Sequence, residues 1–165
     1  PLDALGRSRR RVVCPPMVET AKERTTIDAP VQAVFDTLVD FEAYPQWVPD
    51  LKATRVVDTD DEGRGVEVEF RAAAMGRSTS YRLAYDYEDA PARLGWRLAE
   101  GDIQRELDGA YHLAPAPGHP DRTEVVYELS IDLIVPVPGF VKRRAESRIV
   151  KAALEELKKR VESRR

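Results

Sequence analysis

The chain of 165 residues is 42% hydrophobic and 33% charged, with a formal net charge of −3. This length and composition are typical of one globular domain with a sizeable core. The single cysteine excludes an internal disulfide, the two histidines are too few and too poorly placed for a zinc cluster, and no apolar run approaches the ~20 residues that span a bilayer. We therefore expect a cytoplasmic protein with no metal, no cofactor and no transmembrane segment.

The first sixteen residues differ from the rest in charge. Residues 1–16 contain four arginines and one aspartate, a net charge of +3, which leaves −6 for the rest of the chain. We expect residues 1–16 to be a flexible basic extension, with Met17 as the natural first residue, and residues 17–165 to form the folded domain. The acidic charge of that domain argues against nucleic acid as a partner, because phosphate binding needs a clustered cationic face.

The first predicted elements are a strand and a short helix. Residues 18–27 favour extended structure, and apolar side chains recur at helical spacing from Val31 to Val39. Asp28 is a candidate N-cap for this helix, and Pro30 fits its first turn, where the missing N–H group costs no hydrogen bond.

Two prolines prevent this helix from continuing. Pro45 and Pro49 restrict the residues before them to extended conformations. The segment between the prolines is therefore stiff. We expect Trp47, at its centre, to pack over one end of a cavity.

Alternating apolar and polar side chains then predict a series of half-buried strands. Short polar turns join consecutive strands, as around Gly63 and Gly76, so the pattern favours an antiparallel, strongly curved sheet of about six or seven strands. After the strand at residues 18–27, the predicted strands begin near residues 51, 66, 81, 93, 105 and 125.

One long helix is predicted at the C-terminus. The prolines and glycine of residues 136–139 end the last strand, and residues 140–163 contain neither proline nor glycine. At ~1.5 Å per residue this helix is about 35 Å long, enough to lie across the whole sheet. Its expected apolar stripe consists of Val141, Ala145, Ile149, Ala152, Ala153, Leu157 and Val161.

The order of these elements resembles a known superfamily. A helix that opens at Ala29-Pro30-Val31, the motif Asp40-x-x-x-Tyr44-Pro45-x-Trp47-x-Pro49, several strands and a long terminal helix are similar to the START-like (SRPBCC) superfamily, in particular its polyketide cyclase/dehydrase and coenzyme Q-binding branches. The resemblance covers about residues 18–161. It implies an α+β helix-grip fold for the domain at 17–165: a curved antiparallel β-sheet wrapped around a long C-terminal α-helix, with an internal hydrophobic cavity for a ligand.

The candidate ligand-binding residues are mostly aromatic. They fall on the apolar registers of different strands, so a curved sheet brings them to one concave face, where a wet or ligand-filled cavity satisfies tyrosine hydroxyl groups at less cost than a dry core. For each residue alone, a place in an ordinary core fits equally well. Arg105 shares the inward register of Tyr111, where its guanidinium can bind a ligand oxygen, but it lies at the strand start and can instead turn to solvent. The predicted set is Trp47, Phe70, Tyr81, Tyr85, Trp96, Arg105, Tyr111, Tyr127 and Phe140.

Two functions fit these residues. There is no Gly-x-Ser-x-Gly motif, no phosphate-cradling loop and no His-Glu-x-x-His motif. We predict binding or carriage of a hydrophobic small molecule, such as a polyketide, quinone or lipid. The alternative is a polyketide aromatase/cyclase in which Arg105 and the tyrosines position a poly-β-keto intermediate, since positioning supplies much of a cyclisation barrier. The inward registers show no clear general base, which favours non-catalytic binding; the ligand and the oligomeric state stay open.

A macromolecular partner is a third class of function. Some START-like proteins have such partners, and they need an exposed apolar or basic patch. The net charge of −6 outside the first sixteen residues gives no support for such a patch.

Overall fold

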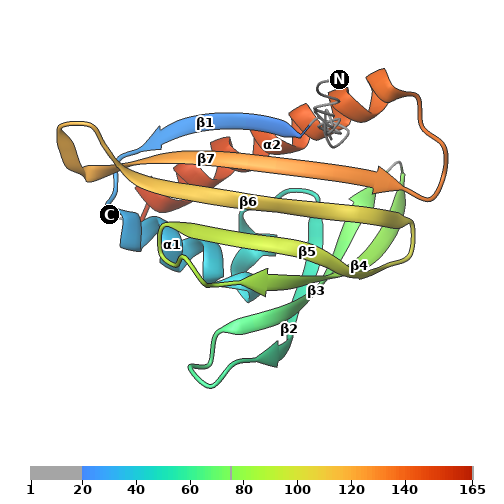
Figure 1. Ribbon diagram of the computed structural model, residues 1–165, viewed down its shortest axis with the longest axis horizontal. Helices are drawn as coiled ribbons and strands as arrows, with labels where there is room; N and C mark the ends of the chain where they lie inside the picture. Colours follow the sequence, from blue (N-terminus) through green and yellow to red (C-terminus); the bar gives the residue numbers. More distant parts are fainter. Residues whose placement is uncertain (1–19, 75, 165) are drawn as a thin grey trace, which may run out of the picture.

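The computed structural model describes residues 20–74 and 76–164, and its main feature is a curved sheet of seven antiparallel strands (Figure 1). The spatial order of the strands is β1-β7-β6-β5-β4-β3-β2, so consecutive strands from β2 to β7 are neighbours and β1 pairs with β7. The strands are β1 (Ala21–Ile27), β2 (Leu51–Thr59), β3 (Gly65–Ala74), β4 (Arg77–Asp86), β5 (Arg93–Gly101), β6 (Gln104–Ala116) and β7 (His119–Leu133). The predicted extension at 1–16, the domain start at Met17 and the first two residues of the strand predicted at 18–27 lie outside the described residues.

Three helical elements accompany the sheet. The α-helix α1 (Val31–Val39) and the 3₁₀ helix η1 (Phe41–Gln46) connect β1 to β2, and α2 (Gly139–Glu162) follows β7. α2 packs mainly on β1 and β7 and also meets α1 (Figure 1). This arrangement confirms the predicted α+β helix-grip architecture with one unbroken C-terminal helix.

α1 begins later than its predicted cap. Pro30 occupies the N-cap position, and its carbonyl oxygen accepts hydrogen bonds from the N–H groups of Ala33 and Val34 at 3.0 and 3.3 Å. Asp28, the predicted N-cap, lies two residues too early for that role, and its backbone N–H donates to Glu162 Oε1 at 3.1 Å. This bond ties the start of α1 to the end of α2.

The buried face of α2 differs from the predicted apolar stripe. Leu157 and Val161 are buried as predicted and Ala153 is half-buried, but four predicted residues are exposed: Val141, Ala145, Ile149 and Ala152. The prediction assumed that every apolar residue at helical spacing faces the core, whereas α2 packs on one narrow face against β1, β7 and α1. The buried residues are Glu146, Val150, Leu154, Leu157 and Val161.

A carboxylate anchors the first half of α2 to the sheet. Glu146 is 2% exposed, its Oε1 lies 3.7 Å from Lys142 Nζ, and its carboxylate faces the backbone N–H of Ile131. The pairing of β1 with β7 ends where Ala21 faces Leu129, so Ile131 lies beyond the last pair of that ladder. Glu146 therefore places a carboxylate beside a backbone donor of a free strand edge.

Candidate ligand-binding site

A continuous series of aromatic rings fills the space between the sheet and η1. Neighbouring rings have centroids 4.3 to 6.1 Å apart, the distances of direct ring contact. Tyr81 and Tyr85 are half-buried, and the other members are buried. This aromatic network consists of Phe41, Tyr44, Trp47, Phe70, Tyr81, Tyr85, Trp96, Tyr111 and Tyr127. It brings together all of the predicted ligand-binding residues except Arg105 and Phe140.

The strand register places the central rings opposite one another. Tyr85 on β4 pairs with Trp96 on β5, and Tyr111 on β6 pairs with Tyr127 on β7, where the two rings stack at 4.3 Å and 17°. Trp96 also faces Gly109 on β6, and a Cβ atom at Gly109 would lie 2.5 Å from Trp96 Cζ2. The bare backbone of Gly109 therefore lets the indole reach both tyrosines.

η1 contributes two rings that the sequence analysis did not include in the site. Phe41 lies 4.5 Å from Tyr85 between ring centroids, and Tyr44 lies 6.1 Å from Phe70. The Tyr44 hydroxyl donates to the carbonyl oxygen of Leu38, which fixes the ring over the sheet. The spacing of Phe41, Tyr44 and Trp47, three residues apart, would have shown that they share one face of a 3₁₀ turn.

Burial keeps the tyrosines of the network protonated. Loss of water around the hydroxyl groups is the largest cause that raises the pKa of Tyr44, Tyr85, Tyr111 and Tyr127, and it raises the pKa of Tyr81 as well. These groups therefore act as neutral hydrogen-bond donors at physiological pH. They are poorly suited to act as general bases, which require a pKa near the working pH.

Some hydrogen-bond donors of the network have no acceptor within the described residues. Trp47 is 7% exposed, and its Nε1–H has no hydrogen-bond partner within the described residues. In the same part of the chain, no hydrogen bond from the hydroxyl groups of Tyr81 or Tyr85 is found. A buried donor without a partner is costly, so a water molecule or a ligand oxygen is the natural complement.

Comparison with known proteins identifies the family. Residues 18–162 match the family described as "Polyketide cyclase / dehydrase and lipid transport". The chain belongs to this family. The match confirms the predicted START-like membership, while the coenzyme Q-binding branch stays a prediction. No curated protein matches the sequence closely.

Solved structures share the fold of this family member. A START superfamily protein from Mycobacterium smegmatis has a TM-score of 0.82 and 23% identity, covering 88% of this chain and 99% of that one. The Zhui aromatase/cyclase from Streptomyces sp. R1128 has a TM-score of 0.68 and 15% identity, covering 88% and 94%. A STAR-related lipid transfer protein from Xanthomonas axonopodis has a TM-score of 0.62 and 17% identity, covering 86% and 84%. At these identities the likeness shows the fold alone.

Arg105 does not point into the site of this polyketide cyclase and lipid transport family member. The β6–β7 pairing steps by two residues on β6, from Gln104 to Glu106, against one on β7, so Arg105 is an extra residue at an irregularity. Gln104 is buried in its place, and the Arg105 side chain is 65% exposed, 3.8 Å from Asp132. The alternating pattern predicted the inward register for Arg105 because a bulge is invisible in it.

Phe140 also lies away from the network. It is in the first turn of α2 and is 62% exposed, because this part of the helix does not cover the aromatic rings. The structure therefore does not bring Phe140 together with the other predicted ligand-binding residues.

Charged groups of the described chain lie outside the aromatic network. The outward-facing His112 places Nε2 3.4 Å from Glu128 Oε2, and His119 is exposed. No three histidine, cysteine, aspartate or glutamate side chains within residues 20–74 and 76–164 are grouped to hold a metal ion. The arrangement can therefore exclude water and donate neutral hydrogen bonds, while proton abstraction has no evident base.

Proposed function

We propose that this protein reversibly binds a hydrophobic, partly oxygenated small molecule at the aromatic network without making or breaking a bond. The observation that carries the proposal is the network itself, in which nine rings from η1 and five strands meet on one side of the sheet. Such sites bury an apolar ligand and orient it through a few polar groups. Polyketides, quinones and lipids have this chemistry.

The polar groups within the network suit an oxygenated ligand. The indole N–H of Trp47 and the hydroxyl groups of Tyr81 and Tyr85 are donors without a partner in the described structure. A carbonyl, quinone or ester oxygen accepts from such donors, whereas a pure hydrocarbon would leave them unsatisfied.

Ligand entry involves separation of rings that touch in this conformation. Tyr81 and Tyr85 are the members of the network that are half-buried, so we place the entrance beside them. Tyr81 stacks on Phe70 at 5.4 Å, and Tyr85 contacts Trp96 at 6.0 Å. A flat or flexible apolar molecule that replaces these contacts retains most of the buried area.

A polyketide cyclase-like activity is the second candidate, since the family includes cyclases and dehydrases. The exposed Arg105 no longer offers a guanidinium to a poly-β-keto chain, and burial keeps the tyrosines protonated. Binding is therefore favoured over catalysis on the chemistry of the site.

Tryptophan fluorescence provides the test, because Trp47 and Trp96 both belong to the network. Quinones, fatty acids and aromatic polyketides are titrated against the wild type and Tyr85→Ala. We expect one class to quench with saturation and Tyr85→Ala to weaken its affinity by about tenfold, equivalent to about 1.4 kcal/mol.

Tyr87→Phe is the matched control. Tyr87 is also a β-sheet tyrosine, but its ring contacts Phe35 and its hydroxyl donates to the carbonyl oxygen of Gly65 at 2.5 Å, outside the network. The Tyr87→Phe variant should bind the ligand with the affinity of the wild type. Binding of none of the three classes, or turnover of a poly-β-keto thioester by the wild type, would overturn the proposal.

A further inference from the structure

The exposed apolar side chains of the described chain are concentrated in one segment. All five large hydrophobic residues that are strongly exposed lie between residues 134 and 149: Ile134 (52%), Val135 (60%), Phe140 (62%), Val141 (41%) and Ile149 (41%). This segment comprises the whole β7–α2 connection, residues 134–138, and the first half of α2, at one end of the molecule (Figure 1). Such concentrated apolar exposure marks an interaction surface.

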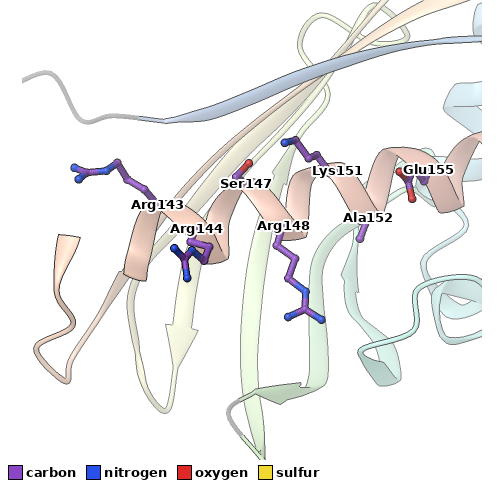
Figure 2. A pocket seen from close by; sticks show the side chains of 7 residues that line it. All are labelled: Arg143, Arg144, Ser147, Arg148, Lys151, Ala152 and Glu155. Carbon is purple, nitrogen blue, oxygen red and sulfur yellow. The ribbon is translucent and has the colours of Figure 1, made fainter. Parts of the chain in front are cut away.

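The same segment is strongly basic. Residues 134–151 contain five cationic side chains and one acidic side chain, the buried Glu146, a net charge of +4 in a chain of net charge −3. Of these cations, Arg143, Arg144, Arg148 and Lys151 line an open groove of about 680 Å³ on α2, together with Glu155. Arg144 and Arg148 point to one side of the helix and Lys151 to the other (Figure 2). We call the five exposed apolar residues and these cations, Lys142, Arg143, Arg144, Arg148 and Lys151, the apolar-basic face.

Two arginines of this face lack the ion pairs that some arginines of the sheet make. Arg24, Arg55 and Arg93 each lie within 3.1 to 3.4 Å of a carboxylate oxygen. Arg144 and Arg148 have no ion pair with any residue that the structure describes. Their charge is therefore available to an external anion.

We propose that the apolar-basic face docks the protein on the surface of an anionic lipid bilayer. A bilayer surface presents phosphate groups above an apolar interior. The face presents a net positive charge, with Arg144 and Arg148 outside any ion pair of the described chain, beside exposed apolar side chains of α2 and of the connection before it. An acidic protein would match the charges, but the exposed side chains of Ile134, Val135, Phe140 and Val141 are matched better by the apolar interior of a bilayer. No helix in the described chain is long and apolar enough to cross a membrane, so the contact is with the surface.

The anchoring of α2 makes this face a fixed platform. Glu146 ties the first half of the helix to Ile131 at the sheet edge, and Val150 and Leu154 are buried one and two turns later. The exposed side chains of this half therefore project from a helix that is already held in place. Docking needs no unfolding of α2.

Vesicle co-sedimentation tests the charge requirement. The full chain is mixed with phosphatidylcholine vesicles with and without phosphatidylglycerol. We expect the wild type to bind the anionic vesicles and Arg148→Glu to bind them at least tenfold more weakly. The control is Lys159→Glu, which makes the same charge change at a 73% exposed position in the second half of α2 and should bind as the wild type does. Equal loss in both variants would show that net charge, rather than this face, governs binding.

A tryptophan reporter tests the apolar contact. The native Trp47 and Trp96 are 7% and 9% exposed, so Phe140→Trp adds the one exposed indole among the described positions. Its fluorescence should be quenched by vesicles that contain brominated lipids, and Phe140→Ser should sediment poorly. Absence of quenching, equal binding to neutral and anionic vesicles, or binding to neither would overturn the proposal. Ligand titration is a separate readout, so failure here leaves the proposed function standing.

Discussion

Trp47 and Phe140 are aromatic residues beside prolines, and they have opposite environments. Trp47 lies between Pro45 and Pro49 and is 7% exposed, whereas Phe140 follows Pro138 and is 62% exposed. The Trp47 ring lies 5.0 Å from Tyr44 in the aromatic network. At the start of α2, Phe140 contacts no other aromatic ring of the described residues. Prolines restrict the backbone in both places, but the surface beneath the segment decides whether an aromatic ring is buried.

The two halves of α2 repeat this contrast on one helix. Leu154, Leu157 and Val161 pack inward in the second half, whereas Val141 and Ile149 are exposed in the first. Both halves have apolar residues at helical spacing, so periodicity alone does not reveal which face is covered. The exposed apolar residues of the first half belong to the apolar-basic face that we propose contacts a bilayer.

The largest expected effect is a difference in stability between variants of Trp47 and Phe140. Trp47→Ala should lower the free energy of unfolding by about 3 kcal/mol, because a buried indole is lost from a packed cluster. Phe140→Ala should change it by less than about 0.5 kcal/mol, as for other surface substitutions. Urea unfolding of both variants checks this, and equal destabilisation would contradict the different burial of the two rings.

A smaller difference in stability is expected between variants in the two halves of α2. Leu157 is 0% exposed, so Leu157→Ala should lower the free energy of unfolding by about 2 to 3 kcal/mol. Ile149 is 41% exposed, and Ile149→Ala should cost less than about 1 kcal/mol. Thermal unfolding of the pair provides the measurement. A greater loss for Ile149→Ala would show that the first half of α2 packs on the sheet.

The smallest effect concerns the pH dependence of stability. Burial raises the pKa of the Glu146 carboxyl above its ordinary value of 4.5, so its ionised form disfavours folding. This cost is present above the raised pKa and fades as the pH falls toward 4.5. Glu146→Gln keeps an oxygen for the Ile131 N–H and should remove this dependence. Urea midpoints across that pH range should fall with rising pH more steeply for the wild type than for the variant. Parallel curves would contradict the raised pKa of Glu146.

Much of the fold could be predicted from the sequence, because short antiparallel connections and period-two alternation specify a meander. The same alternation placed Tyr81, Tyr85 and Trp96 on one face, as the structure shows. Residues on regular strands were thus predictable, since each register extends over a whole strand.

The remaining features depend on irregular or tertiary structure. A single extra residue on β6 turns Arg105 outward, and nothing in the residue types marks this bulge. The rotation of α2 depends on which strands lie beneath it, so the exposure of Ile149 and the burial of Glu146 follow from packing. Net charge also failed to indicate the apolar-basic face, because a sum over the chain hides a local cluster.

Native mass spectrometry tests the central claim most directly. The protein is incubated with a quinone, a fatty acid and an aromatic polyketide in turn, exchanged into volatile buffer and weighed intact, with Trp47→Ala and Phe140→Ala in parallel. We predict that the wild type and Phe140→Ala retain one molecule of one class per chain and that Trp47→Ala loses most of it, because Trp47 belongs to the network and Phe140 does not. Retention that is lost in Phe140→Ala but kept in Trp47→Ala would place the ligand on α2 and contradict the account.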